Sequence, residues 1–344
     1  MSAPRPTPQG SIAQPIDIVI PWVDGSDGQW RQRRDQYSGN VGASAREVRF
    51  RDWGTLRFVL RGIDAFMPWV RRIHLVTEGH TPDWIVFNDR LRHVKHEDYI
   101  PAKYLPTFNV NTIEMNIHRI PGLADRFIYF NDDTLVVRPI PGDAMFAAGL
   151  PCDEMVLNRI TGSLDDVVAA QIWVHDMCVL NDSFDTRAFK RAHRAWFFDR
   201  HYSLRSRLRS AQLLAFPEIS NFLWHHNPSP LLRSTLVDIW EAYPEILDAS
   251  CRTKFRAANN VNQYLARGWQ YLTGNFTPRD ISTHSRVYHG IARNLPAIAR
   301  DLGDHSITMI CLNDDASDAM EPETISALHR LLEARMPSPS VFEK

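Results

Sequence analysis

Residues 127–133 carry the feature that most constrains the fold, a run of large apolar side chains that ends abruptly in two carboxylates. The aromatic and β-branched residues of this run are typical of a buried strand. Asp132 and Asp133 cannot remain inside an apolar layer without a partner, so we expect them at the C-terminal end of the strand. Ligands of open α/β sheets collect at that edge, where hard carboxylate oxygens suit Mg²⁺ or Mn²⁺ carrying a phosphate.

A second copy of this pattern follows an apolar segment near the end of the chain, at Asn313, Asp314 and Asp315. A single Asn-Asp-Asp sequence is most simply a solvated turn after a strand, because Asn and Asp side chains hydrogen-bond their own backbone. The repetition indicates instead two strand ends that face one site.

The loop after the first predicted strand could hold a nucleotide. A short β-branched segment at residues 16–20 is followed at once by Trp22, Asp24, Gly25, Ser26 and Asp27. Trp22 would stack on a base, and Gly25 would let the backbone approach the ligand. Asp24 or Asp27 would bind ribose hydroxyls or metal. An Asp-Gly turn with Trp22 in the core fits the same residues equally well.

The following segments alternate between helix and strand. Apolar residues recur at helical spacing over residues 52–67, with Asp52 as the candidate N-cap and Pro68 as the stop. Residues 73–77 and 91–96 are predicted strands, and residues 231–247 a predicted helix. Strand, helix and strand in this order favour an α/β fold with a parallel sheet.

Two further segments carry candidate acid–base residues. Glu114 and His118 lie four residues apart and would share one face of a short helix. The spacing of Asn111 and Glu114 also matches a capping box, which we favour for Glu114 from spacing alone. His225 and His226 precede Asn-Pro where regular structure ends, and a loop histidine at neutral pH can be a base, an acid or a ligand.

The composition narrows the class of protein. A formal net charge of -1 over 344 residues gives no attraction to nucleic acid, so no nucleic-acid partner is expected. Four widely spaced cysteines argue against a structural zinc site or a disulfide scaffold and fit a reducing cytosol. No apolar run reaches the roughly 20 residues that cross a bilayer. We expect a cytoplasmic protein, with peripheral association at the inner face of the membrane left open.

The chain is expected to form one domain. Residues 1–15 have almost no large apolar side chains and are predicted to be a disordered leader. Residues 16–344 would form a single catalytic α/β domain. Arg-rich helical stretches at residues 187–194 and 205–209 are most simply solvated faces, although a basic surface could also meet an anionic acceptor or a lipid headgroup.

Together these stretches resemble the Stealth family, sugar-phosphate transferases that include bacterial capsule polymerases and the catalytic subunit of lysosomal-enzyme N-acetylglucosamine-1-phosphotransferase. The resemblance covers four blocks in the family's order: residues 16–27, residues 52–133, His226-Asn227-Pro228 with Phe255-Arg256, and residues 311–314. Residues 139–220 match little of the family pattern and are therefore expected to be a variable insertion and a possible acceptor region.

The resemblance implies a Rossmann-like core of the GT-A type, with a mostly parallel sheet and helical insertions, that binds a UDP-sugar. It implies metal-dependent transfer of hexose-1-phosphate, with N-acetylglucosamine-1-phosphate as the expected group, to a glycan hydroxyl. UMP would be released, and the reaction would serve capsule or cell-surface polysaccharide synthesis. An ordinary GT-A glycosyltransferase that releases UDP is the alternative. A non-catalytic glycan-binding protein would be expected to lack at least one reacting residue.

Carried over position by position, the resemblance assigns Asp132 and Asp133 to the divalent metal and residues 22–27 to the nucleotide pocket. The reacting centre would be completed by four residues, Glu114, His226, Arg256 and Asp314.

The chemistry of hexose-1-phosphate transfer gives each of these four residues an expected role. Displacement at the sugar-bearing phosphorus needs positive charge on the phosphoryl oxygens, which Arg256 and the metal would supply. His226 is the first candidate for the base that takes the acceptor hydroxyl's proton, and Glu114 is the second. Asp314 would orient the base or bind metal.

Overall fold

The computed structural model describes residues 14–39, 50–314 and 321–344. Its centre is a five-stranded sheet in the order β10-β4-β1-β2-β3. Strands β1 to β4 are parallel to one another, and β10 pairs antiparallel with β4 at the edge. The sheet strands are β1 (Ile16–Pro21), β2 (Arg72–Thr77), β3 (Leu91–Lys95), β4 (Arg126–Tyr129) and β10 (Ser229–Leu232). The predicted α/β class with a mostly parallel sheet is confirmed.

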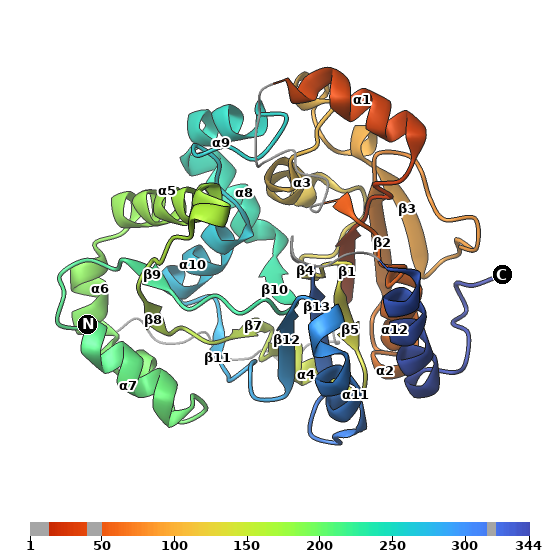
Figure 1. The fold of residues 1–344 in the computed structure, drawn as a ribbon. Helices are drawn as coiled ribbons and strands as arrows, with labels where there is room; N and C mark the ends of the chain where they lie inside the picture. The colour runs from red at the N-terminus through yellow and green to blue at the C-terminus, as the bar shows by residue number, and fades with distance from the viewer. Residues whose placement is uncertain (1–13, 40–49, 315–320) are drawn as a thin grey trace.

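Apolar cores cover both faces of this sheet, which explains why β1 and β4 are continuous apolar runs rather than alternating ones. Ile18 and Ile128 belong to the core that also contains side chains of α2, α11 and α12. Val19 and Tyr129 point to the opposite core, which contains side chains of α3, α5, α8, α9 and α10. The chain therefore forms helix, sheet and helix layers (Figure 1).

The helices between and around the strands have the following bounds: α1 (Gly28–Ser38), α2 (Leu56–Phe66), α3 (Val110–Asn116), α4 (Gly142–Met145), α5 (Val167–Ser183), α6 (Thr186–Ala192), α7 (Leu204–Leu213), α8 (Arg233–Ala242), α9 (Pro244–Cys251), α10 (Gln263–Thr273), α11 (Leu295–Gly303) and α12 (Pro322–Arg335). The smaller sheets contain β5 (Thr134–Val136), β6 (Phe146–Ala147), β7 (Leu150–Asp153), β8 (Leu157–Asn158), β9 (Asn221–Phe222), β11 (Thr277–Pro278), β12 (Ser285–His289) and β13 (Met309–Asn313). None of the described helices is long and apolar enough to cross a membrane.

One small sheet brings the two Asn-Asp sequences together. β13 pairs antiparallel with β5, which follows Asp133 directly. The backbone N–H of Leu312 donates to the carbonyl of Asp133 over 2.9 Å. The end of β13 therefore lies beside the turn after β4, as the repeated pattern predicted. Asp315 lies outside the described residues.

Three local predictions were wrong. The helix predicted from residue 52 begins at Leu56 with Thr55 as its N-cap, and the Asp52 carboxylate instead accepts from the N–H of Gly54 over 2.8 Å. The helix predicted over residues 231–247 begins after β10 and is divided into α8 and α9, because Pro244 starts a new helix. Residues 1–13 of the predicted leader lie outside the described residues.

The third error concerns the capping box predicted at Asn111 and Glu114. The N-cap of α3 is Asn109, whose side chain accepts from the N–H of Asn111. His118 lies in the short 3-10 helix that follows α3 and packs near the ring of Trp240, with 6.1 Å between ring centroids. Because the helix changes type after Asn116, Glu114 and His118 do not form the pair that their spacing suggested.

A candidate active site at the carboxyl end of the central sheet

Asp132 and Asp133 lie in the turn after β4 and are half-buried at the carboxyl end of the parallel strands. Burial raises the pKa of the Asp132 carboxyl well above its usual range, and the nearby carboxylates of Asp133 and Asp52 raise it further. Burial also acts on Asp133, but the His226 imidazole outweighs it and lowers the pKa of that carboxyl. Closely placed carboxylates of this kind create a site for a cation.

His226 reaches this edge from the loop before β10. Its Nε2 atom lies 3.5 Å from Oδ2 of Asp133 and 3.0 Å from Nδ2 of Asn131. Burial lowers the pKa of the imidazole, but the Asp133 carboxylate outweighs burial, so the pKa of His226 is raised. The structure thus brings His226 together with the predicted metal-binding carboxylates.

Glu114 lies beneath the same edge and is 6% exposed. Its Oε2 atom accepts from the backbone N–H of Gln263 at the start of α10, over 3.1 Å. Burial raises the pKa of the carboxyl, against the stabilising effects of this hydrogen bond, of Tyr129 and of the Arg256 and His226 charges. Glu114 is therefore a buried carboxyl of the site, where sequence spacing favoured a helix cap.

Arg256 is half-buried and close enough to lower the pKa values of both Glu114 and His226. Asp314 has a different environment from the one expected for a residue that orients the base. Its carboxylate forms a two-bonded ion pair with Arg51, in which Nε and Nη2 lie 2.7 and 2.8 Å from its oxygens. Glu114 and Arg256 therefore lie within electrostatic reach of His226, which contacts Asp133, while Asp314 is held by Arg51 at the end of β13.

The loop after β1 contains the residues predicted to line a nucleotide pocket. Asp24 accepts from the backbone and hydroxyl of Ser26, over 2.8 and 2.6 Å. Asp27 is the N-cap of α1 and accepts from the N–H of Trp30 over 2.6 Å. A Cβ atom on Gly25 would lie 1.9 Å from the carbonyl oxygen of Phe50. Any other residue would therefore clash with the Phe50 backbone, and only glycine fits at this position. These contacts form a rigid loop that can present acceptors to a ligand.

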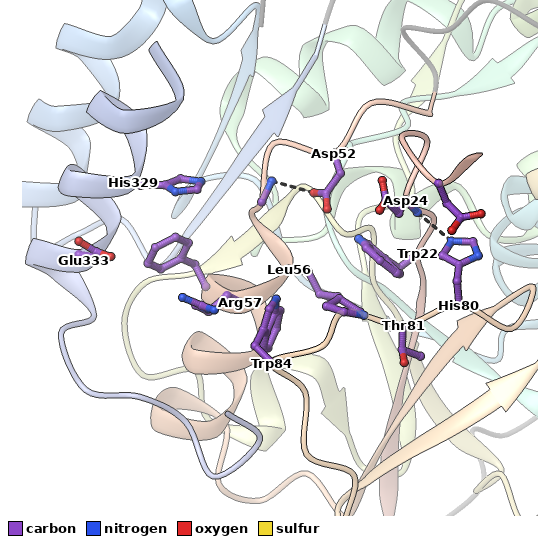
Figure 2. A pocket seen from close by; sticks show the side chains of 14 residues that line it. Trp22, Asp24, Asp52, Leu56, Arg57, His80, Thr81, Trp84, His329 and Glu333 are labelled. Carbon is purple, nitrogen blue, oxygen red and sulfur yellow. Dashed lines mark hydrogen bonds between the residues drawn. The ribbon is translucent and has the colours of Figure 1, made fainter. Parts of the chain in front are cut away.

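A cavity of about 340 Å³ opens beside this loop. Trp22, Asp24 and Asp27 line it, although Trp22 is only 6% exposed and also belongs to the apolar core. Other lining residues are Asp52, Arg57, His80, Trp84 and His329. Figure 2 shows the rings of Trp22, His80 and Trp84 on one side and His329 across the cavity. Trp22 therefore packs in the core, as one alternative from the sequence had it, and also borders the cavity.

Sequence reasoning missed several of these lining residues. His80 accepts from the N–H of Asp24 over 2.9 Å and so supports the loop, and burial lowers the pKa of its imidazole. Arg57 lies over the ring of Trp84, with 4.9 Å from Cζ to the ring centroid. The Gly79-His80-Thr81-Pro82 sequence after β2 was the available signal, because it follows a parallel strand at the same edge as the Trp22 loop.

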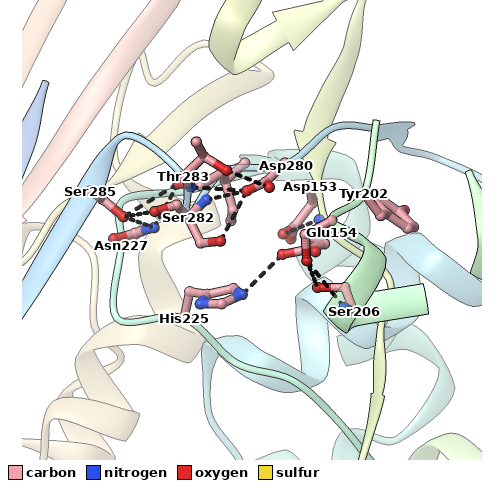
Figure 3. Close-up of polar contacts among 12 residues, drawn as sticks. Asp153, Glu154, Tyr202, Ser206, His225, Asn227, Asp280, Ser282, Thr283 and Ser285 are labelled. Atoms are coloured by element: carbon pink, nitrogen blue, oxygen red, sulfur yellow. Dashed lines mark hydrogen bonds and ion pairs between the residues drawn. The ribbon is translucent and has the colours of Figure 1, made fainter. Parts of the chain in front are cut away.

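A second polar cluster lies next to His226 and was also missed (Figure 3). Nε2 of His225 lies 3.0 Å from Oε2 of Glu154, which is 1% exposed. The fully buried Arg267 forms a two-bonded ion pair with Asp153, over 2.7 and 2.8 Å, and its Nη1 lies 3.4 Å from the carbonyl of His225. These contacts fix the backbone of the histidine pair and hence the position from which His226 reaches Asp133.

One group of side chains near the site has the geometry of a possible metal site. Ligand atoms of Asp133, His226 and Cys311 all lie within 4.8 Å of one another. Burial and the Asp133 charge raise the pKa of the Cys311 thiol well above its usual range. Such a mixed oxygen, nitrogen and sulfur set suits zinc better than magnesium, whereas Asp132 and Asp133 offer the oxygen ligands that magnesium or manganese prefers.

Comparison with known proteins identifies the family of this chain. Residues 14–42 match Stealth protein CR1, conserved region 1, and residues 49–152 match Stealth protein CR2, conserved region 2. The capsular polysaccharide phosphotransferase WcwK of Streptococcus pneumoniae is 31% identical over 96% of this chain and 98% of its own length. The chain belongs to the Stealth family.

Other members of the Stealth family match over similar lengths. The receptor polysaccharide phosphotransferase WefC of Streptococcus oralis is 32% identical over 95% of this chain and 99% of its own length. An exopolysaccharide phosphotransferase of Lactiplantibacillus plantarum is 32% identical over 96% of both chains. The prediction of a transferase of this family is confirmed. The crystal structure of the galactosyltransferase LgtC aligns with a TM-score of 0.39 and 10% identity, over 92% of this chain and 95% of LgtC.

Proposed function

We propose that this Stealth protein transfers hexose-1-phosphate, specifically N-acetylglucosamine-1-phosphate, from a UDP-sugar to a hydroxyl of a glycan and releases UMP. The observation that carries the proposal is the meeting of His226 with Asp133 at the end of β4, with Glu114 and Arg256 close by. Carboxylates that can hold a metal, a group that can take a proton and a guanidinium suit phosphoryl transfer, which depends on positioning and on stabilising charge. The polysaccharide phosphotransferase names of full-length relatives support the same reaction.

Asp132 and Asp133 would hold the divalent metal. Their fit rests on their half-buried position beside each other, where burial raises the pKa of the Asp132 carboxyl and repulsion from the Asp133 and Asp52 carboxylates raises it further. A bound cation removes that repulsion, because it compensates closely placed negative charges. When bound, Mg²⁺ or Mn²⁺ would neutralise charge on the diphosphate and orient it.

The protein's own residues would supply the remaining steps. The acceptor hydroxyl oxygen forms a bond to the sugar-bearing phosphorus, and the bond from that phosphorus to the oxygen of the departing UMP breaks. The proton of the hydroxyl passes to the imidazole of His226, and the imidazolium that forms is stabilised by the nearby Asp133 carboxylate. Arg256 binds the phosphoryl oxygens of the transition state, for which a planar guanidinium is suited.

The cavity beside the Trp22 loop would receive the nucleoside of the donor. Its volume of about 340 Å³ falls within the range of small-molecule sites. Trp84 would stack on the base, and Asp24 would accept from ribose hydroxyls. Asp52 connects this cavity to the metal-binding carboxylates, because it lines the cavity and also influences the pKa of Asp132.

The deciding experiment identifies the nucleotide released from UDP-N-acetylglucosamine in the presence of Mg²⁺, a polysaccharide acceptor and no phosphatase. UMP with a phosphodiester in the product is expected. Stoichiometric UDP with a phosphorus-free product would overturn the proposal and favour a GT-A glycosyltransferase. UMP release that persists after complete removal of divalent cations would overturn the metal assignment alone.

A further inference from the structure

The outward face of α7 carries large apolar side chains that nothing in the described structure covers. Leu204 is 66% exposed, Leu208 is 57% exposed, and Phe216 in the turn after the helix is 61% exposed. Leu204 and Leu208 are four residues apart and therefore lie on one face of the helix. Side chains of this size are usually buried when they recur at helical spacing.

The two buried residues of α7 are polar, and of its leucines only Leu213, at the C-terminal end, packs against the apolar core. Ser206 and Ser210 are its buried residues. The Ser210 hydroxyl accepts from the backbone N–H of Leu157 in β8 over 3.2 Å, which fixes the helix against the protein. An amphipathic surface helix normally turns its apolar stripe toward the core. In α7, Leu204 and Leu208 face outward instead. Exposed apolar side chains of this kind mark a surface that binds a protein or a membrane.

These apolar side chains border one shallow depression, with a volume of about 930 Å³. Leu204, Leu208 and Phe216 line it together with Arg159, Arg205 and Arg209. We call these six residues the α7 surface. In Figure 1, α7 lies at the edge of the molecule, on the opposite side from α12.

The charged side chains in and around α7 are positive. Residues 200–216 include four arginines and no aspartate or glutamate. The nearest acidic residue before them, Asp199, accepts from both the backbone and the ring of His201, over 3.0 and 2.8 Å. Arginines beside exposed leucine and phenylalanine are typical of segments that lie in the headgroup region of an anionic membrane.

The segment that carries Phe216 is anchored before any ligand binds. The Lys190 ammonium donates to the carbonyls of Phe216 and Glu218, the latter over 3.2 Å. The N–H of Phe216 also donates to the carbonyl of Leu213 over 3.2 Å. Because its backbone is fixed in this way, the phenylalanine ring remains on the outside and is available for insertion between lipids.

We propose that the α7 surface docks this protein on an anionic phospholipid bilayer, with Leu204, Leu208 and Phe216 inserted and Arg159, Arg205 and Arg209 at the phosphates. The apolar side chains and the arginines both contribute to binding, because membrane affinity increases with the apolar area inserted and with electrostatic attraction to anionic lipid. Docking also orients the candidate site. β9 pairs with β8 at this surface, and the chain reaches His226 four residues after Phe222.

Co-sedimentation of the full chain with lipid vesicles tests this docking without measuring turnover. We expect the protein to bind vesicles of phosphatidylcholine and phosphatidylglycerol about tenfold more tightly than vesicles of phosphatidylcholine alone, with weaker binding as salt is raised. Leu204→Ser with Leu208→Ser is expected to weaken binding to the anionic vesicles about tenfold or more. Arg205→Glu should abolish the preference for anionic lipid.

Matched controls come from exposed residues elsewhere. Val341→Ser removes an apolar side chain that is 59% exposed, and Arg330→Glu reverses an exposed charge on α12. Both should bind vesicles as the unmodified protein does. Unchanged binding in the α7 variants, or no vesicle binding by the unmodified protein, would overturn the proposal. So would a concentration-dependent dimer that the double serine variant abolishes in the absence of lipid, because the surface would then join two copies of the chain.

Discussion

Nε2 of His226 lies 3.5 Å from Oδ2 of Asp133, although the two residues are far apart in the sequence. Their meeting follows from the edge of the central sheet. Ser229 at the start of β10 pairs antiparallel with Tyr129 at the end of β4. The segment before β10 and the segment after β4 therefore leave the sheet at the same edge, and their side chains can form one site.

Replacing either carboxylate after β4 should remove turnover and preserve the fold. In Asp132→Asn and Asp133→Asn, a neutral amide replaces a charged oxygen ligand, so we expect the rate to fall by roughly 10² or more. Thermal stability without metal should hold or rise in Asp132→Asn, because burial and like charges disfavour the ionised Asp132 carboxyl. It should fall in Asp133→Asn, because that change removes the ion pair with His226. Mn²⁺ binding, measured by electron paramagnetic resonance, should weaken in parallel. Asp89→Asn, at a side chain 98% exposed, is the control. Normal activity in both variants would place the metal elsewhere.

The roles of His226 and Glu114 can be separated by comparing rate with metal binding. His226→Ala should lower the rate by roughly 10² to 10⁴, as expected for loss of a general base, and should leave Mn²⁺ affinity nearly unchanged. Glu114→Gln should have the smaller effect on rate, because Glu114 is buried and already accepts from Gln263. The opposite ranking would exchange the two roles. Loss of Mn²⁺ affinity in His226→Ala would make the histidine a ligand.

The sequence predicted the parts of the site whose signals are local. Asp132 and Asp133 end an apolar run, and a buried parallel strand is the structure that such a run most directly specifies. The same reasoning located β1 and β2, which are short, mostly buried runs bounded by turns, whereas in β3 only Leu91 and Val94 are buried. Resemblance to the family, rather than spacing, connected Glu114 with His226.

Other parts of the site depend on long-range packing that no local pattern contains. Leu231 and Leu232 belong to an edge strand that pairs with β4, whereas residues 231–247 were predicted as one helix. Glu114 has a capping-box spacing but accepts instead from Gln263, at the start of α10. The buried Arg267 and Asp153 pair likewise joins residues whose separate sequence neighbourhoods give no sign of contact.

Removing Trp84 should weaken donor binding and leave the chemical step almost intact. The ring lines the cavity beside the Trp22 loop, away from the group around His226. Loss of base stacking is expected to raise the donor KM about tenfold in Trp84→Ala, with little change in kcat. Titration with UMP, which needs no turnover, should show the same weakening. Tyr37→Ala, at an exposed ring on α1, is the control. A fall in kcat at unchanged KM would contradict a nucleoside pocket here.

Replacing Arg256 by lysine should lower activity although the positive charge is kept. Arg256→Lys keeps one positive charge but loses the planar pair of donors that matches phosphoryl oxygens. We expect kcat to fall about tenfold or more, with a smaller change in donor KM, because the contact strengthens in the transition state. Arg330→Lys on the surface of α12 should change neither constant. Equal activity in Arg256→Lys would show that a point charge suffices.

Asp17 should make the protein's stability depend on pH in acid. This fully buried carboxylate at the start of β1 accepts from Arg71 Nε over 2.8 Å and from the N–H of Ala124 over 2.9 Å. Burial alone would raise its pKa, but the hydrogen bonds from Arg71, His74 and Ala124 outweigh burial and lower the pKa from 3.8 to about 2.

Because the folded pKa of Asp17 is the lower one, its contribution is present above about pH 4 and is lost as the pH falls toward 2. The shift corresponds to about 2 kcal/mol of unfolding free energy. Asp17→Asn should therefore be less stable than the unmodified protein at neutral pH, by at least about 2 kcal/mol, and the difference should narrow between about pH 4 and pH 2. Urea unfolding of both proteins across this range measures the difference. A gap that stays constant down to pH 2 would show that the ionisation of Asp17 contributes nothing to folding.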